Sequence, residues 1–222
     1  MTAPMAWPSI AEIQALNRLI GRGYASNGQP RAFTEREFYE ISWIMGWHPR
    51  NPEYRRLFAR LADWIVAELK PERVLEIGCG PGHLLHCISE HGIAACGVDA
   101  NPYSQAFFKA YSPAHADRYH LDLLFEGSYA AADTVLAIEC FEHIPDDGLD
   151  NIMQRLRDEI RPLRIVFSST PHAESDPDWD LQWGHINIKT PALWQEFFGR
   201  YGYRIDGRRP PVTEWAACYV RD

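Results

Sequence analysis

The chain has 222 residues, of which 46% are hydrophobic and 23% charged, as in an ordinary soluble globular domain. Its 30 acidic and 22 basic side chains give a formal net charge of −8, which argues against nucleic-acid or polybasic membrane binding because phosphate affinity comes mostly from clustered cations. No apolar run approaches the roughly 20 residues that span a bilayer, and the N-terminus lacks the pattern of a secretory signal. We therefore expect a cytoplasmic protein.

The five cysteines are consistent with that compartment. They are odd in number, lie mostly in apolar segments and include no CxxC pair. Such cysteines are expected to be buried, reduced thiols. The spacing argues against a zinc ribbon or a thioredoxin-like redox pair.

The first 70 residues are predicted to be helical. Apolar side chains recur every three to four positions in residues 10–20 and again in residues 57–69, which is the period of an amphipathic helix. Pro71 ends the second of these segments. We assign residues 1–55 to a helical N-terminal cap and residues 56–222 to the main domain.

From residue 72 onward, short apolar runs alternate with amphipathic segments. Alternation at this spacing is typical of a doubly wound, mainly parallel α/β sheet. The last two runs are separated only by a loop with Gly207 and two prolines, a spacing that allows an antiparallel hairpin. We therefore predict a seven-stranded, mainly parallel sheet. Its strands are expected at 73–77, 94–98, 118–121, 134–138, 164–168, 203–205 and 216–220, and its helices near 83–90, 103–111, 147–159 and 191–201.

The segment Val74–His83 carries the most information about a ligand. A buried strand runs into Gly78, Gly80 and Gly82, and a helix begins directly after them. Glycines let backbone amides approach a ligand, and the helix N-terminus adds the positive end of a dipole. A dinucleotide fingerprint needs glycine at position 83, where this chain has histidine, and the Gly-Lys-Ser/Thr of a P-loop is absent. An NAD or ATP site is therefore not predicted.

The string from Glu76 to Gly82, E-x-G-x-G-x-G, closely resembles motif I of the class I S-adenosylmethionine-dependent methyltransferases. The next predicted strand ends near Asp99, and in such a sheet that carboxylate lies beside the glycine loop. The resemblance implies the Rossmann-like methyltransferase fold and S-adenosylmethionine as cofactor. It also implies that Asp99 accepts from both ribose hydroxyls, that Asp122 meets the adenine amino group, and that Glu76 helps to orient the methionine ammonium. The residues that we expect to line the cofactor are Glu76, Gly78, Cys79, Gly80, Gly82, Asp99, Ala100, Asp122, Leu123 and Glu139.

A second polar cluster, Glu139-Cys-Phe-Glu142-His143, follows the fourth predicted strand. If this stretch is helical, its two glutamates and its histidine share one face. Gathered carboxylates are costly unless they share a cation or a proton, which points to a metal. The segment resembles the E-x-x-E-H segment of the ubiquinone-biosynthesis O-methyltransferases and of enzymes that methylate the 3′-terminal ribose of small RNAs. The latter resemblance implies a site for Mg²⁺ or Mn²⁺ held by Glu139, Glu142, His143 and His185.

The metal would hold two acceptor oxygens and lower the pKa of the attacking hydroxyl. Many methyltransferases carry similar strings without a metal. If no metal is bound, His143, His172 or His185 is the candidate general base, because imidazole titrates near neutral pH. The residues themselves leave the two versions open.

The sequence thus predicts an S-adenosylmethionine-dependent methyltransferase that acts on a small molecule, at a hydroxyl. An N-methyltransferase of an amine or amino sugar is the main alternative, because a neutral amine needs no strong base. A cofactor-binding scaffold subunit is the non-enzymatic alternative. Methylation of RNA ends is disfavoured by the net charge of −8 and by the lack of an appended RNA-binding domain. Neither the acceptor nor the oligomeric state can be read from the sequence.

Overall fold

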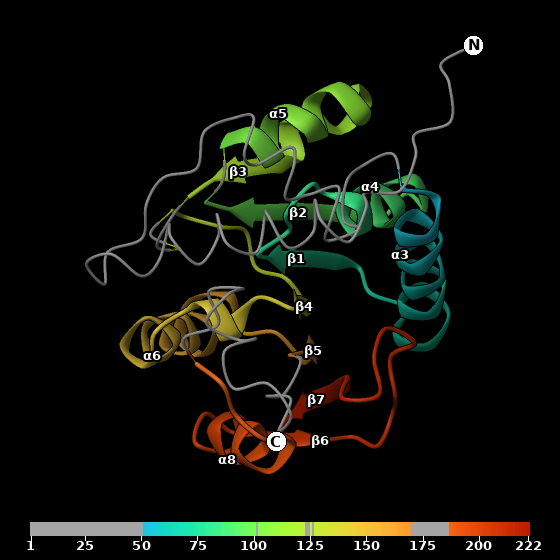
Figure 1. Ribbon diagram of the computed structural model, residues 1–222. Helices are drawn as coiled ribbons and strands as arrows, with labels where there is room; N and C mark the ends of the chain where they lie inside the picture. Colours follow the sequence, from blue (N-terminus) through green and yellow to red (C-terminus); the bar gives the residue numbers. More distant parts are fainter. Residues whose placement is uncertain (1–50, 101, 123–124, 126, 170–186) are drawn as a thin grey trace, which may run out of the picture.

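One sheet organises the computed structural model, which describes residues 51–100, 102–122, 125, 127–169 and 187–222 (Figure 1). The strands in these residues are β1 (Arg73–Ile77), β2 (Ala94–Asp99), β3 (Tyr119–Leu121), β4 (Thr134–Ile138), β5 (Arg164–Ser168), β6 (Tyr203–Ile205) and β7 (Ala217–Arg221). Their order across the sheet is β3-β2-β1-β4-β5-β7-β6. This arrangement confirms the predicted seven-stranded, mainly parallel sheet.

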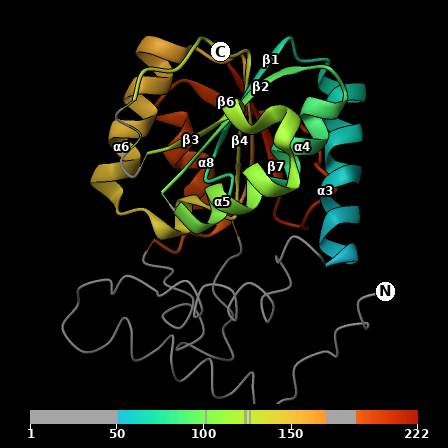
Figure 2. The same cartoon turned by 90° about the horizontal axis from the view of Figure 1, so that it is seen from above.

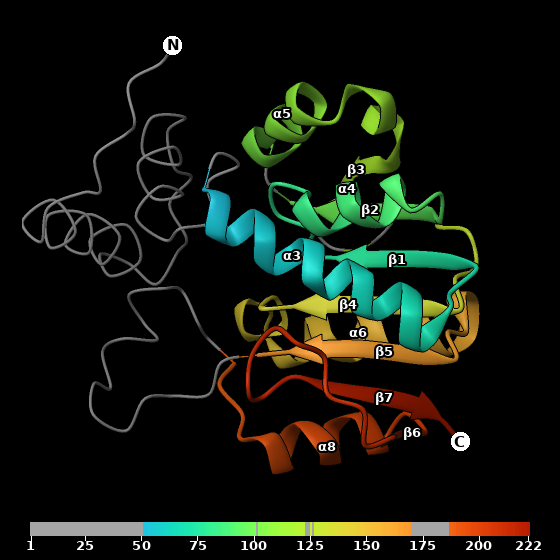
Figure 3. The same cartoon turned by 90° about the vertical axis from the view of Figure 1, so that its right-hand side faces the viewer.

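The direction of the strands gathers the candidate residues at one edge. Neighbouring strands from β3 to β5 are parallel, whereas β7 runs antiparallel to both β5 and β6. Figure 3 shows the arrowheads of β1, β4 and β5 on the same side, with β7 pointing the other way. The segments that follow the parallel strands therefore meet along this edge, and the antiparallel pairing expected for the last two strands is confirmed.

Helices cover both faces of the sheet (Figure 2). They are α3 (Pro52–Trp64) with the π-helical turn η1 (Ile65–Leu69), α4 (His83–Glu90), α5 (Pro102–Tyr111) with the 3₁₀ segment η2 (Pro113–Arg118), the 3₁₀ turn η3 (Phe141–His143), α6 (Asp146–Arg155) with the π-helical turn η4 (Leu156–Ile160), and α8 (Pro191–Gly199). The helices predicted between the strands are thereby confirmed. None of the helices in the described part of the chain has the length and apolar character of a membrane span.

Two apolar layers hold these helices to the sheet. Strand β4 is buried along its whole length, and its side chains alternate between the layers. Val135 and Ala137 join the layer built with α6 and α8. Leu136 and Ile138 join the layer built with α3, α4 and Phe108 of α5. A strand covered on both faces needs a continuous apolar run, which is why β4 lacks the alternation of a half-exposed strand.

Helix α3 starts with a well-formed cap. The side-chain oxygen of Asn51 accepts from the backbone amides of Glu53 and Tyr54 at 2.9 and 3.4 Å, and Pro52 occupies the first helical position. The helix packs against α4 and belongs to the apolar layer on that face. The predicted boundary after residue 55 lies within this helix, and the domain division stays a prediction. The helices expected in the first 50 residues lie outside the described residues.

Candidate functional site

The glycine loop joins β1 to α4 and is fixed to the neighbouring strand. The backbone amides of Gly78 and Cys79 both donate to the carbonyl oxygen of Val98, at 2.8 and 3.1 Å. The backbone angle φ is +70° at Gly78, +49° at Gly80 and +77° at Gly82. Residues other than glycine rarely adopt such positive values. The loop is therefore a tight turn whose backbone follows the end of β2.

The three glycines face different surroundings. A Cβ atom at Gly78 would lie 2.2 Å from Sγ of Cys140, and one at Gly82 would lie 2.2 Å from Cδ2 of Phe108. A Cβ atom at Gly80 would meet no described atom within 4 Å. Packing thus requires glycine at the first and third positions. The middle glycine borders space that no described atom fills, as expected for the part of such a loop that meets a ligand.

Gly80 is held through both of its backbone groups. Its amide donates to Oδ2 of Asp99 at 2.8 Å, and its carbonyl oxygen accepts from the hydroxyl of Tyr119 at 2.8 Å. The structure therefore brings the predicted cofactor residues Gly80 and Asp99 into direct contact. Ala100 follows as an exposed residue at the same edge.

Glu76 is a buried carboxyl group beneath this loop. Its side chain is 4% exposed, and its Oε2 atom has no hydrogen-bond partner among the described residues. Burial raises the pKa of Glu76 to about 8, the negative charge of Asp99 adds to the rise, and a hydrogen bond from the backbone of Leu85 opposes it. A cation placed beside this group would lower its pKa again.

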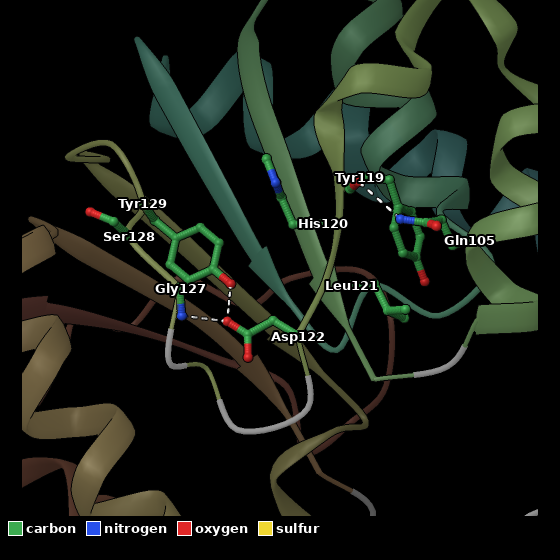
Figure 4. Close-up of a pocket in the computed structure, with 8 residues that line it drawn as sticks. All are labelled: Gln105, Tyr119, His120, Leu121, Asp122, Gly127, Ser128 and Tyr129. Carbon is green, nitrogen blue, oxygen red and sulfur yellow. Dashed lines mark hydrogen bonds between the residues drawn. The ribbon is translucent and has the colours of Figure 1, made fainter.

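Asp122 lies one residue beyond β3 and is tied to its surroundings. Its backbone amide donates to the carbonyl oxygen of Asp99 at 3.0 Å. Its Oδ2 atom accepts from the backbone amide of Gly127 at 2.6 Å and from the hydroxyl of Tyr129 (Figure 4). A cavity of about 520 Å³ adjoins these side chains, and its lining includes Gln105 and Ser128. A volume of this size suits a small-molecule ligand.

The stretch after β4 differs from the expected helix. Glu139 has φ of +48°, its amide donates to the carbonyl oxygen of Ser168 at 2.8 Å, and its Oε1 atom accepts from the Ser168 hydroxyl. Helical structure is confined to the 3₁₀ turn η3, in which Glu142 is fully buried and His143 is exposed. The stretch is therefore not the helix on which a shared face of the two glutamates and the histidine depended, because the bonds to Ser168 hold Glu139 outside the turn.

Glu142 is a second buried carboxyl group. Its side chain interacts with the Ser169 hydroxyl and with the Glu139 carboxyl group. Burial raises its pKa to about 8, and the charge of Glu139 adds to the rise. Its backbone oxygen accepts from the amide of Asn187 at 3.0 Å, which links this turn to the first residue described after the gap.

Three predicted residues lie outside the described residues: Leu123, His172 and His185. Within the described ranges, no group of three or more His, Cys, Asp or Glu side chains is arranged to hold a metal ion. The four-residue metal site therefore stays a prediction that depends on His185.

Sequence reasoning missed two tyrosines at this edge. Tyr54 of α3 packs its ring 5.2 Å from that of His83, and burial and the charges of Glu76 and Glu139 raise its pKa. Tyr129 bonds to Asp122. Neither residue belongs to a motif, and both reach the site from segments whose position depends on the tertiary fold.

The comparison with protein families agrees with this geometry. A family model described as a methyltransferase domain matches residues 47–206. The chain belongs to this methyltransferase-domain family, and the resemblance drawn from the glycine loop is confirmed. Its Rossmann-like methyltransferase fold is confirmed as well.

Among curated proteins, the ubiquinone biosynthesis O-methyltransferase of Paracidovorax citrulli is 32% identical over 115 residues, which cover 48% of this chain and 48% of that protein. The enzyme of the same name from Cupriavidus pinatubonensis is 27% identical over 168 residues, covering 71% of this chain and 65% of that protein. In the first of these matches the chain spans about half the length of its curated relative, and in the second about two thirds.

Solved structures share the fold at low sequence identity. Magnesium protoporphyrin IX methyltransferase from Synechocystis, with bound SAH, has a TM-score of 0.60 at 15% identity, covering 92% of this chain and 99% of that one. The methyltransferase domain of bacterial CtHen1 has a TM-score of 0.55 at 16% identity, covering 77% of this chain and 99% of that one.

Proposed function

We propose that this chain transfers a methyl group from S-adenosylmethionine to a hydroxyl of a small molecule. The hydrogen bond from the Gly80 amide to Asp99 carries the proposal, because it joins the glycine loop and the acidic end of β2 at one point. Membership in the methyltransferase-domain family supports the cofactor. Two curated relatives named as O-methyltransferases support oxygen as the methyl acceptor.

The cofactor would lie along the carboxyl edge of the sheet. We assign the methionine end to the loop Gly78–Gly82, with the Glu76 carboxylate beside the ammonium group. Asp99 would accept from the ribose hydroxyls, and Asp122 from the adenine amino group. The remaining proposed lining residues are Cys79, Ala100, Leu123 and Glu139.

In the reaction, the acceptor oxygen attacks the methyl carbon. The new C–O bond forms while the C–S bond breaks. The electron pair of the C–S bond stays on sulfur, which becomes the thioether of S-adenosylhomocysteine. Alignment of oxygen, carbon and sulfur supplies much of the rate, since effective molarities of well-oriented groups correspond to about 7–11 kcal/mol. The hydroxyl proton passes to a base, for which His143, His172 and His185 are the candidates.

A divalent metal is the other proposed route to an ionised acceptor. The Glu142 side chain is fully buried, and it is close enough to Glu139 for the two charges to interact. Carboxylate oxygens suit Mg²⁺ or Mn²⁺. These two groups would need His143 and His185 to complete the site. A bound metal would position two acceptor oxygens and lower the pKa of the hydroxyl.

The reaction class is tested by incubating the protein with S-adenosylmethionine labelled in its methyl group. The acceptors are a catechol, a vicinal diol, a primary amine and an amino sugar, each assayed for label transfer and for release of S-adenosylhomocysteine. We expect label on the oxygen of the catechol or the diol. Transfer to the amines alone would contradict the proposed oxygen chemistry. Cofactor binding without turnover on any acceptor would support a scaffold instead.

The metal is tested by calorimetric titration of Mn²⁺ into chelator-treated protein saturated with S-adenosylhomocysteine. The metal-assisted version predicts saturable binding that Glu142→Gln abolishes. Glu196→Gln, an exposed change on α8, serves as the matched control and should bind like the unmodified protein. Equal binding by both variants would contradict a site at Glu142.

A further inference from the structure

The Asp122 carboxylate is fixed by the segment that follows it in the chain. The Tyr129 hydroxyl and the Gly127 amide both donate to the same oxygen, Oδ2 (Figure 4). Two donors on one carboxylate oxygen hold that oxygen in place and restrict the rotation of the group. The Asp122 side chain therefore keeps one orientation relative to the other polar groups that line the cavity.

Tyr129 is itself held from two sides. Its ring is stacked on that of Phe125, with centroids 4.9 Å apart and planes inclined by 11°. The guanidinium of Arg155 on α6 lies 5.1 Å from the Phe125 ring and donates to the carbonyl oxygen of Gly127 at 2.7 Å. The hydroxyl that reaches Asp122 is thus anchored to the helix on this face of the sheet.

The direction of the hydrogen bond follows from the chemistry of the pair. Burial raises the pKa of Tyr129, and the hydrogen bond to Asp122 and the charge of Asp122 raise it further. The phenol therefore keeps its proton and donates, and the carboxylate accepts. A carboxylate held in this way presents acceptor oxygens to the cavity, which match an amino group on a ring and oppose a carbonyl oxygen in the same place.

We propose that Tyr129 is a positioning residue that orients Asp122 and thereby makes the 520 Å³ cavity selective for a 6-aminopurine over a 6-oxopurine. The inference rests on the proposed function, since it takes this cavity to receive the base of the cofactor. Loss of the hydroxyl removes one of the two described donors to Oδ2, so the carboxylate gains freedom to turn away from the amino group.

The test compares two ligands that differ at one position of the base. Dissociation constants for S-adenosylhomocysteine and S-inosylhomocysteine are measured by calorimetry on the full chain, and their ratio is the readout. Tyr129→Phe keeps the ring and removes the hydroxyl. We expect Tyr129→Phe to lower the preference for the adenosyl ligand about fivefold. This is the effect of losing one hydrogen bond, here the one between Asp122 and the amino group of the base. Asp122→Asn should lower it further.

Tyr201→Phe is the matched control, because it removes a tyrosine hydroxyl that donates to another aspartate, Asp150, at 2.5 Å. The control should keep the ratio of the unmodified protein. An unchanged ratio in Tyr129→Phe would overturn the inference, and so would an equal loss of affinity for both ligands, which indicates a structural role alone. If the unmodified protein binds neither ligand, the proposed function fails and the inference with it.

Discussion

The backbone amide of Gly80 donates to Oδ2 of Asp99 at 2.8 Å, although the two residues are 19 positions apart. The Tyr119 hydroxyl holds the carbonyl oxygen of the same glycine. The loop and the acid are therefore set relative to each other before any ligand arrives. Such preorganisation reduces the ordering that binding has to pay for.

The open space at Gly80 gives the first prediction. Gly80→Ala and Gly202→Ala both place a side chain at positive φ, +49° and +79°, and neither Cβ meets a described atom within 4 Å. Both should lower the free energy of unfolding by about 1–2 kcal/mol. Gly80→Ala alone should weaken binding of S-adenosylhomocysteine, by about tenfold or more, because its Cβ enters the proposed ligand space. Denaturant unfolding and calorimetry check the pair, and equal affinity in both variants would contradict the assignment.

Gly78 should respond differently, because packing rather than ligand space confines it. Its Cβ would lie 2.2 Å from Sγ of Cys140 and 2.7 Å from Cβ of the same residue. Gly78→Ala should therefore destabilise the protein by about 1–3 kcal/mol more than Gly202→Ala does. Cys140→Gly removes the clashing atoms, so the double variant should be less destabilised than the sum of the two single ones. Strict additivity in urea unfolding would refute the contact.

The raised pKa of Glu76 predicts that cofactor binding releases a proton. At pH 7 a carboxyl group with a pKa of about 8 is mostly protonated. A ligand ammonium beside it favours the ionised form, so binding should release up to about one proton and grow tighter as the pH rises toward 8. Calorimetry in buffers with different ionisation enthalpies measures this number. Glu76→Gln should bring it close to zero, and an unchanged value would place the proton elsewhere.

The same group predicts how stability depends on pH. The folded-state pKa of Glu76 is raised from 4.5 to about 8, so its favourable contribution is complete below pH 4.5. Between pH 4.5 and 8 the unfolded chain releases the proton that the folded chain retains. This lowers the free energy of unfolding by up to about 1.4 kcal/mol per pH unit, and the loss ends above pH 8.

Urea unfolding at several pH values separates this contribution from the others. Glu76→Gln should flatten the decline between pH 5 and 8. The exposed neighbour Glu72, changed to Gln, is the matched control and should leave the profile as it is. If both variants follow the profile of the unmodified protein, Glu76 does not hold the proton.

The sheet and the glycine loop were predictable because their signals are local. The strand from Arg73 to Ile77 and the helix from His83 to Glu90 have the bounds expected from apolar runs and glycines alone. The spacing between Gly78 and Asp99 follows from the strand–helix–strand unit. The hydrogen bond from the Gly80 amide to Asp99 could not be predicted from residue spacing, because spacing does not say which atoms come into contact.

The second cluster was harder because distant residues decide it. A helical stretch would have placed Glu139, Glu142 and His143 on one face. Glu139 instead adopts a left-handed conformation while its amide and carboxylate bond to Ser168, which is 29 residues away. The link between Tyr129 and Asp122 was equally hidden, since it depends on how a loop packs against Arg155 of α6.

The most direct test of the account is the binding of S-adenosylhomocysteine to the unmodified protein and to Asp99→Ala, measured by isothermal calorimetry. We predict saturable binding at one site, with a loss of about 100-fold in Asp99→Ala because two hydrogen bonds to a charged acceptor disappear. Asp117→Ala, at an exposed position in η2, should bind like the unmodified protein. No binding to the unmodified protein, or equal binding by both variants, would contradict the account.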